Sequence, residues 1–394
     1  MPTKKLSHIL VVVGMVVILL NSCKPSQVST SQKPPSADTT DIPTYYITSD
    51  GDTLESLEET VDINIHRLLK DTISVIGVGD IMMGTNFPSE KYLPPENGSR
   101  LWREVNDLLN DADLTFGNLE GVILDSGGTQ KKCNNPDLCY LFRTPERFIS
   151  NLVDAGFDVM SMANNHAGDF GPEGRENTVK VLDSLGINHA GLIERPYCLI
   201  TIEGIKFGFA AFSPNTGTLS INDHEEAKKI VTHLDSMSDI VIVSFHGGAE
   251  GSKYQHVLRE TEFFYGENRG NIYEFAHDLI NSGADIIFGH GPHVTRAIEV
   301  YQNKFIAYSL GNFCTYARFN LKGANGLAPI IKVYTDHRGK FLWGQIIPIF
   351  QEGEGGPKID PQKRVIKTLQ ELTSTDFPEV EISINDDGLI TYIE

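Results

Sequence analysis

The chain has 394 residues, 40% of them hydrophobic, and a formal net charge of −19 at pH 7. This length exceeds the usual size of one domain but fits a large α/β domain with tails. The acidic balance argues against nucleic-acid binding, which requires clustered Lys and Arg. It also means that an anionic ligand would need a local cation.

The N-terminus has the pattern of an export signal. Lys4 and Lys5 precede an apolar run over residues 9–20, which is too short to span a membrane. The run ends in Leu20-Asn21-Ser22-Cys23, which resembles the lipobox of bacterial lipoproteins. We therefore predict a signal peptide over residues 1–22 and a lipid on Cys23. The protein would then be anchored to a membrane of the bacterial cell envelope, facing outside the cytoplasm. A plain secretory signal is the alternative.

Two further segments precede the expected domain. Residues 23–43 are rich in Ser, Thr, Pro and Gln and have no aromatic residue, so we expect a disordered tether. Residues 44–72 suggest a short hairpin and a helix, and we treat them as an N-terminal extension. Cys133 and Cys139 lie in a polar loop, where export permits a disulfide, although two free thiols are the alternative. Cys198 and Cys314 lie in apolar runs typical of small buried residues.

From residue 73 to residue 350, strand and helix patterns alternate. Apolar runs of strand length alternate with amphipathic segments that favour helices, among them 145–155, 174–185, 225–237 and 271–282. This alternation predicts a mixed or parallel sheet covered by helices, hence an α/β domain. Residues 351–394 are acidic and weakly patterned, with one helix expected near 361–372. We treat them as a C-terminal extension.

Polar residues follow several of the expected strands. In open α/β sheets ligands bind beyond the carboxyl ends of the strands, so side chains at these ends can meet. Carboxylates, imidazoles and an Asn carbonyl form the donor set of a centre with one or two divalent ions. Mixed nitrogen and oxygen ligands favour Mn, Fe, Zn or Co over Ca or Mg. The candidate ligands are Asp80, Glu120, Asn165, His246, His290 and His293.

Three of the candidate ligands also have an ordinary structural interpretation. Asp80 could cap a helix or shape a turn, and Glu120 could be a surface residue of its loop. A single His at a strand end, such as His246, is more often structural. Chance explains one such residue at a strand end more easily than six, and this favours a metal site.

His166 has a different predicted role. It directly follows Asn165, so the two side chains are not expected to face one metal in the same way. An imidazole beside a metal can donate a proton to a leaving oxygen. Asp169, three residues later, could orient that imidazole as carboxylates orient other histidines. Alternatively, Asp169 could cap the helix expected to begin near residue 174.

An ordered set of motifs connects these residues to a known family. The chain resembles the CapA/PgsA-type poly-γ-glutamate capsule biosynthesis proteins, a family similar to the calcineurin-like metallophosphoesterases. The resemblance covers roughly residues 73–320. It is carried by the segments Asp80–Gly84, Gly117-Asn118-Leu119-Glu120, Phe142-Arg143-Thr144-Pro145, Ala163 to Gly171, His246-Gly247-Gly248-Ala249-Glu250, Gly289-His290-Gly291-Pro292-His293 and Ser309-Leu310-Gly311-Asn312-Phe313.

The resemblance implies a metallophosphoesterase-like sandwich of mixed β-sheets flanked by helices, over residues 73–350. It assigns metal binding to the six candidate ligands and the catalytic role to His166. Met82 stands where metallophosphoesterases have a His, so the number of ions stays open. Arg143 and Glu250 lie in family motifs and are expected to face the substrate. An Arg can bind carboxylate or phosphate bidentately, and a structural ion pair is the alternative.

Two functions follow from this interpretation. The first is a metal-dependent hydrolase that cleaves a phosphoester or, less usually, an amide of an acidic polymer. The second is a non-catalytic, membrane-tethered accessory factor for synthesis or export of a capsule polymer, whose metal binds carboxylates without cleaving them. The partners expected from the resemblance are the membrane, through the N-terminal lipid, an acidic polymer substrate and a capsule synthesis complex. A wall lipoprotein with neither metal nor substrate is a third, plainer possibility.

Overall fold

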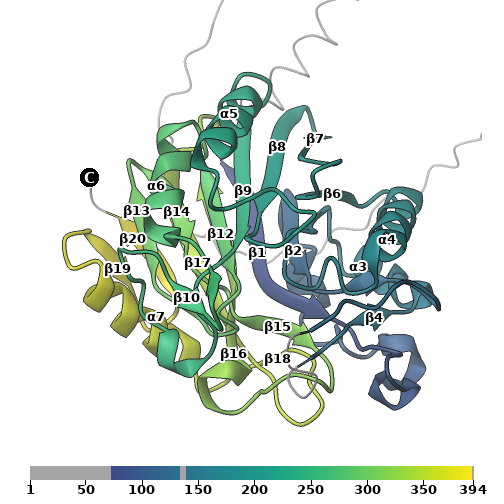
Figure 1. Cartoon of the computed structure of the whole chain (residues 1–394). Helices are drawn as coiled ribbons and strands as arrows, with labels where there is room; N and C mark the ends of the chain where they lie inside the picture. The colour runs from purple at the N-terminus through teal and green to yellow at the C-terminus, as the bar shows by residue number, and fades with distance from the viewer. Residues whose placement is uncertain (1–71, 134–138, 393–394) are drawn as a thin grey trace, which may run out of the picture. The chain divides into compact units, whose positions relative to one another are not determined.

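A computed structural model describes residues 72–133 and 139–392, which form two large β-sheets packed face to face with helices outside (Figure 1). The predicted signal peptide, the lipidated Cys23, the tether and all but the last residue of the N-terminal extension lie outside the described residues. Within the described ranges, no helix has the length and apolar character needed to cross a bilayer.

The larger sheet has ten strands in the order β19-β20-β17-β16-β1-β2-β5-β6, with β15 beside β1 and β18 beside β17. Strand β1 runs parallel to β2 and β15 and antiparallel to β16. The strands are β1 (Ile73–Met82), β2 (Leu114–Leu119), β5 (Val159–Ser161), β6 (Asn188–Ala190), β15 (Asn312–Thr315), β16 (Leu327–Thr335), β17 (Phe341–Phe350), β18 (Lys358–Ile359), β19 (Ile382–Ile384) and β20 (Leu389–Tyr392).

The smaller sheet has the order β13-β14-β12-β9-β8-β7. Its central strands β8, β9, β12 and β14 are parallel, so their carboxyl ends share one edge. The strands are β7 (Tyr197–Ile202), β8 (Ile205–Phe212), β9 (Ile240–His246), β12 (Ile286–His290), β13 (Ile298–Tyr301) and β14 (Lys304–Ala307). Two short ribbons complete the strands, β3 (Val122–Ile123) with β4 (Arg143–Thr144), and β10 (Phe263–Phe264) with β11 (Glu267–Asn268).

Aromatic side chains fill the space between the sheets. Phe116 of β2 stacks on Phe288 of β12 with ring centroids 5.5 Å apart, and lies 5.4 Å from Phe209 of β8. A Cβ atom on Gly77 would lie 2.4 Å from the Phe288 ring, so only glycine at this position lets β1 approach β12. This close approach brings strand ends from both sheets to one place.

Helices cover the outer faces of both sheets. Helices α2 (Asn106–Leu109), α3 (Ser150–Asp154) and α4 (Gly171–Leu185) pack on the larger sheet, and α5 (His224–Asp235) and α6 (Ile272–Asn281) pack on the smaller one. The predicted α/β sandwich of mixed sheets is therefore confirmed. The helix expected over 145–155 is shorter, because a 3₁₀ turn at Glu146–Phe148 precedes α3. The disulfide between Cys133 and Cys139 is formed.

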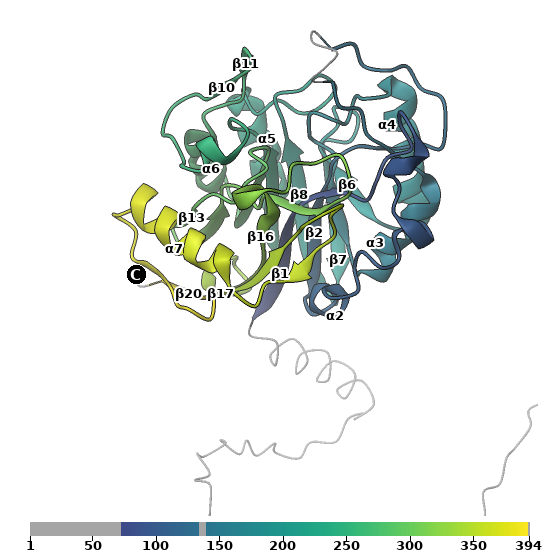
Figure 2. The same ribbon diagram turned by 90° about the horizontal axis from the view of Figure 1, so that it is seen from below.

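The segment after residue 350 belongs to the same domain. Strand β20 pairs with β17, and helix α7 (Arg364–Asp376) packs Val365, Ile366 and Leu369 into the core between the sheets. Figure 2 shows α7 lying beside β17 and β20. The sequence expectation of an extension after residue 350 is corrected here: the strands after this residue span only two to four residues, which leaves little periodicity to detect.

Candidate metal centre

Three of the predicted ligands meet where strands from both sheets end. Asp80 lies near the end of β1, Glu120 directly follows β2, and His246 is the last residue of β9. Each offers one ligand atom, and these atoms lie within 4.8 Å of one another. All three side chains are fully buried. The structure thus brings together residues that are up to 166 positions apart in the chain.

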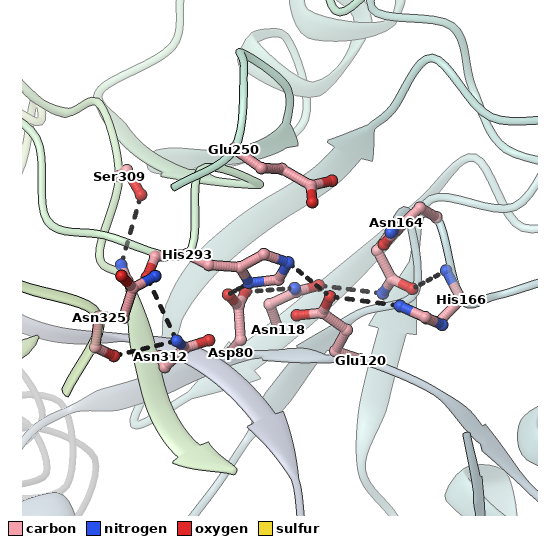
Figure 3. A network of polar contacts seen from close by, with 12 residues as sticks. Asp80, Asn118, Glu120, Asn164, His166, Glu250, His293, Ser309, Asn312 and Asn325 are labelled. Atoms are coloured by element: carbon pink, nitrogen blue, oxygen red, sulfur yellow. Dashed lines mark hydrogen bonds and ion pairs between the residues drawn. The ribbon is translucent and has the colours of Figure 1, made fainter. Parts of the chain in front are cut away.

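Asp80 is held by neighbouring polar side chains (Figure 3). Asn118 Nδ2 donates to Asp80 Oδ1 at 2.8 Å, and Asn164 Nδ2 donates to Asn118 Oδ1 at 3.1 Å. His293 Nδ1 lies 2.9 Å from Asp80 Oδ2. Asn118 and Asn164 lie inside the family motifs, but no sequence pattern indicated that they orient Asp80. Hydrogen bonds from neighbouring residues to a metal-ligating side chain fix the orientation of that side chain.

Glu120 and His246 have buried polar atoms without hydrogen-bond partners among the described residues. Burial and the charge of Asp80 raise the pKa of Glu120 well above its ordinary value, and burial lowers the pKa of His246 well below its own. Buried polar groups that find no partner are costly and rare in native proteins. A divalent cation accepts both a carboxylate oxygen and a neutral imidazole nitrogen, so this donor set fits a metal ion.

His293 joins this centre from a loop. Its Nε2 lies 3.5 Å from Glu120 Oε1, and its backbone has a φ of 56°, which is unusual for a residue with a side chain. Asn312 and Asn325 hold that backbone by donating to the His293 carbonyl at 3.2 and 3.3 Å. Burial opposes protonation, but the charge of Glu120 and the hydrogen bond to Asp80 raise the pKa of His293 to about 9. The imidazolium therefore compensates the carboxylates, and a cation would replace its proton.

His290 departs from the prediction. Its Nε2 donates to the Val78 carbonyl at 3.1 Å, and its Nδ1 faces Ser244 Oγ at 3.4 Å. Both ring nitrogens are therefore engaged by the protein, and the ring packs edge-on against Phe116. In this structure His290 links β12 to β1 by a hydrogen bond and supports the metal centre from outside it. The predicted role of His290 as a metal ligand is therefore corrected.

Asn165 and His166 follow β5 and lie close to the same place. Asn165 keeps a buried Oδ1 that has no partner in the described part of the chain, as a ligand oxygen would. His166 Nε2 faces Glu120 Oε1 at 3.9 Å, while its Nδ1 lies 2.7 Å from Asp169 Oδ2. Asp169 also accepts from the Phe142 backbone N–H at 2.7 Å, so it does not serve as the cap of α4. The arrangement is that of an imidazole oriented by a carboxylate.

The two residues expected to face the substrate differ in their surroundings. Arg143 donates through Nε to Asn86 Oδ1 at 2.7 Å and through Nη1 to the Gly127 carbonyl at 2.8 Å, and its guanidinium lies 4.7 Å from the centre of the Phe170 ring. These contacts commit it to holding loops together. Glu250 is half-buried, points toward His293 and Glu120 (Figure 3) and is ion-paired with a residue that the sequence analysis missed, Arg269.

Comparison with known proteins shows the family of this chain. Residues 74–317 match the model of the family "Bacterial capsule synthesis protein PGA_cap". The chain belongs to this family. As a member of the capsule synthesis family, it is 28% identical to capsule biosynthesis protein CapA of Bacillus anthracis, over 62% of this chain and 60% of the relative. It is 29% identical to PGA biosynthesis protein CapA of Bacillus subtilis, over 62% and 63% respectively.

The chain thus spans about three fifths of the length of these curated family members. Solved structures resemble this capsule synthesis family member more distantly. A hypothetical protein from Thermus thermophilus has a TM-score of 0.43 at 15% identity, covering 72% of this chain and all of that one. The calcineurin-like phosphoesterase YfkN from Bacillus subtilis has a TM-score of 0.37 at 13% identity, covering 73% and 88%.

Proposed function

We propose that the protein is a metal-dependent hydrolase of the cell envelope that acts on a phosphoester or a γ-glutamyl polymer. One observation carries this proposal: Glu120 and His246, both fully buried, present ligand atoms beside Asp80 that have no hydrogen-bond partner among the described residues. Asp80, Glu120, His246 and His293 would hold the ion, with Asn165 as a further oxygen donor. A divalent cation bound there supplies Lewis-acid activation of a phosphoryl or carbonyl oxygen.

The chain's own residues provide the proton chemistry. His166 Nε2 faces the centre, and its Nδ1–H donates to Asp169, which fixes the orientation of the ring. In the doubly protonated imidazolium Nε2 carries the second proton, and this is the proton that it would donate to a leaving oxygen. Phe142 packs on the His166 ring with centroids 4.2 Å apart, and Phe319 stacks on Phe142 at 5.1 Å. These rings restrict water around the imidazole and limit its rotation, so the proton is delivered from one direction.

The setting of this activity is proposed from the sequence and from the relatives. Export with a lipid on Cys23 would place the domain at a membrane surface outside the cytoplasm, and the Cys133–Cys139 disulfide suits an oxidising compartment. The relatives are named for capsule biosynthesis and PGA biosynthesis. These names favour an acidic capsule polymer as substrate and a capsule synthesis complex as partner.

A second candidate is the non-catalytic accessory factor, and Met82 favours it. Met82 is buried, and its sulfur accepts from the Gly84 N–H at 3.3 Å, so this position adds no donor to the centre. A centre with fewer ligands could bind the carboxylates of a polymer without cleaving it. The two candidates share the site and differ only in turnover.

Turnover by the purified, Mn²⁺-loaded full chain on aryl phosphates and γ-linked glutamate oligomers decides between them. The hydrolase predicts that His166→Ala loses about 10²–10⁴-fold in rate while retaining metal by elemental analysis. Glu120→Gln and His246→Ala should lose the metal itself. His233→Ala, at an exposed position on α5, is the matched control and should change neither quantity. Metal binding and polymer binding without cleavage would contradict the hydrolase and support the accessory role.

A further inference from the structure

The residue after the β10–β11 ribbon is a buried cation with spare hydrogen-bond donors. The Arg269 side chain is 2% exposed, and its Nη2 pairs with Glu250 Oε1. Its Nε and Nη1 have no hydrogen-bond partner within residues 72–133 and 139–392, and the carboxylate of Glu267 lies 3.7 Å from Nη1. A guanidinium carries five N–H donors, and leaving several unused in a buried site is costly. These unused donors are typical of an Arg that binds a ligand.

The Arg269 backbone lies against the residues that follow His246. The Gly248 N–H donates to the Arg269 carbonyl at 2.9 Å, and a Cβ atom on Gly247 would lie 2.9 Å from that same oxygen. The Arg269 backbone therefore packs on the two glycines that directly follow His246. Without these glycines the segment bearing Arg269 could not come this close to the end of β9.

The charges agree with this proximity. Burial lowers the pKa of Arg269 to about 10, and the charge of Glu120 opposes that shift. Burial lowers the pKa of His246, and the charge of Arg269 adds to the decrease. The charge of Arg269 also opposes protonation of His293, against the effects of Glu120 and Asp80 that raise the pKa of that imidazole to about 9. The guanidinium thus interacts electrostatically with three members of the centre.

A second buried ion pair holds Arg269 in place. The Arg269 N–H donates to the Glu262 carbonyl at 2.8 Å, and the Glu262 N–H donates to the Gly270 carbonyl at 3.0 Å. The Glu262 carboxylate receives Arg296 Nη1 at 2.7 Å and Nη2 at 2.9 Å, and it also accepts from the Ala249 N–H at 2.9 Å. Glu262 thereby ties the segment bearing Glu250 to the one bearing Arg269, so the guanidinium is pre-organised.

We propose that Arg269 is the anion-binding residue of this site, with its free Nε and Nη1 donors binding an oxyanion of the substrate beside the metal centre. The inference rests on the proposed function and deepens it, because it assigns the substrate a phosphate or carboxylate group next to the bond that is cleaved. Glu250 orients the guanidinium through Nη2. In a chain with a net charge of −19, a cation at this position offsets the repulsion of an anionic substrate. This assigns to Arg269 the role that the sequence suggested for Arg143.

The test measures binding, so it does not depend on turnover. Mn²⁺ and then inorganic phosphate or γ-glutamyl-glutamate are titrated calorimetrically into the full chain and its variants. Arg269→Gln should weaken anion binding at least tenfold and leave Mn²⁺ affinity within about threefold, because charge-assisted hydrogen bonds are lost while the ligands stay. Arg269→Lys keeps the charge, is the variant to rely on if Arg269→Gln fails to fold, and should weaken anion binding by a smaller factor. Arg195→Gln, which breaks an exposed pair with Asp183, is the control and should change nothing.

The two anions identify the group that is recognised. Phosphate binding that depends on Arg269 assigns a phosphoester, and γ-glutamyl-glutamate binding that depends on it assigns the polymer. Equal anion affinity in Arg269→Gln and the unchanged chain, with Mn²⁺ retained, would overturn the inference. Loss of Mn²⁺ together with the anion would also overturn it, since Arg269 would then serve the centre itself. Failure of the unchanged chain to bind Mn²⁺ would instead refute the proposed hydrolase, and phosphate titrated into chelator-treated protein would still test Arg269.

Discussion

The Arg296–Glu262 ion pair gives a quantitative test of how the site is supported. The Arg296 and Glu262 side chains are 0% and 2% exposed and form two hydrogen bonds, at 2.7 and 2.9 Å. Replacing Arg296 by Met leaves the Glu262 carboxylate buried without its counter-charge. Breaking a buried pair in this way costs about 3–5 kcal/mol of unfolding free energy. For a domain of this size each kcal/mol corresponds to about 2 °C, so Tm should fall by about 6–10 °C.

The assay is thermal unfolding of the full chain followed by circular dichroism, with EDTA in every sample so that metal binding does not contribute. The double variant Arg296→Met with Glu262→Gln removes the uncompensated charge and should recover more than half of the loss. Lys358→Met breaks an exposed pair with Glu352 and, as the control, should cost about 0.2–1 kcal/mol. A loss below about 1 kcal/mol for Arg296→Met, or no recovery in the double variant, would refute the reasoning.

Three further outcomes are expected. In Gly79→Ala the new Cβ would lie 1.9 Å from the Gly311 carbonyl, so calorimetry should show a loss of about 1–3 kcal/mol and elemental analysis a loss of metal. Gly168→Ala, whose Cβ would meet a single side-chain nitrogen at 3.4 Å, should retain both. The pKa of His293 is raised to about 9 from an ordinary 6.5, so its protonation stabilises the metal-free fold. This stabilisation is fully present below pH 6.5 and is lost as the pH rises through 9. Mn²⁺ affinity measured by calorimetry should rise across that same window, since binding displaces the proton, and a flat profile in the unchanged chain would contradict this. Chelation should lower the Tm of the loaded protein, because metal at 100 times its Kd contributes about 2.7 kcal/mol.

Much of the fold and the main residues of the site could be predicted from the sequence. Asp80, Glu120 and His246 each stand near or directly after the end of an apolar strand, and strand ends are where an α/β sheet places ligands. The alternation of strand and helix patterns likewise predicted the layered architecture. These features depend on local order in the chain, so they can be detected without coordinates.

The division of roles between two histidines in one motif was decided only by tertiary structure. His290 donates to a carbonyl 212 residues away, at Val78, whereas His293 contacts a carboxylate 213 residues away, at Asp80. The spacing of the two histidines in the sequence is compatible with a structural role or a metal-binding role for each of them. Arg269 had no motif at all: its significance comes from burial and from unused donors beside the centre. Burial and hydrogen-bond partners depend on which distant segments pack together, and only the folded chain determines those neighbours.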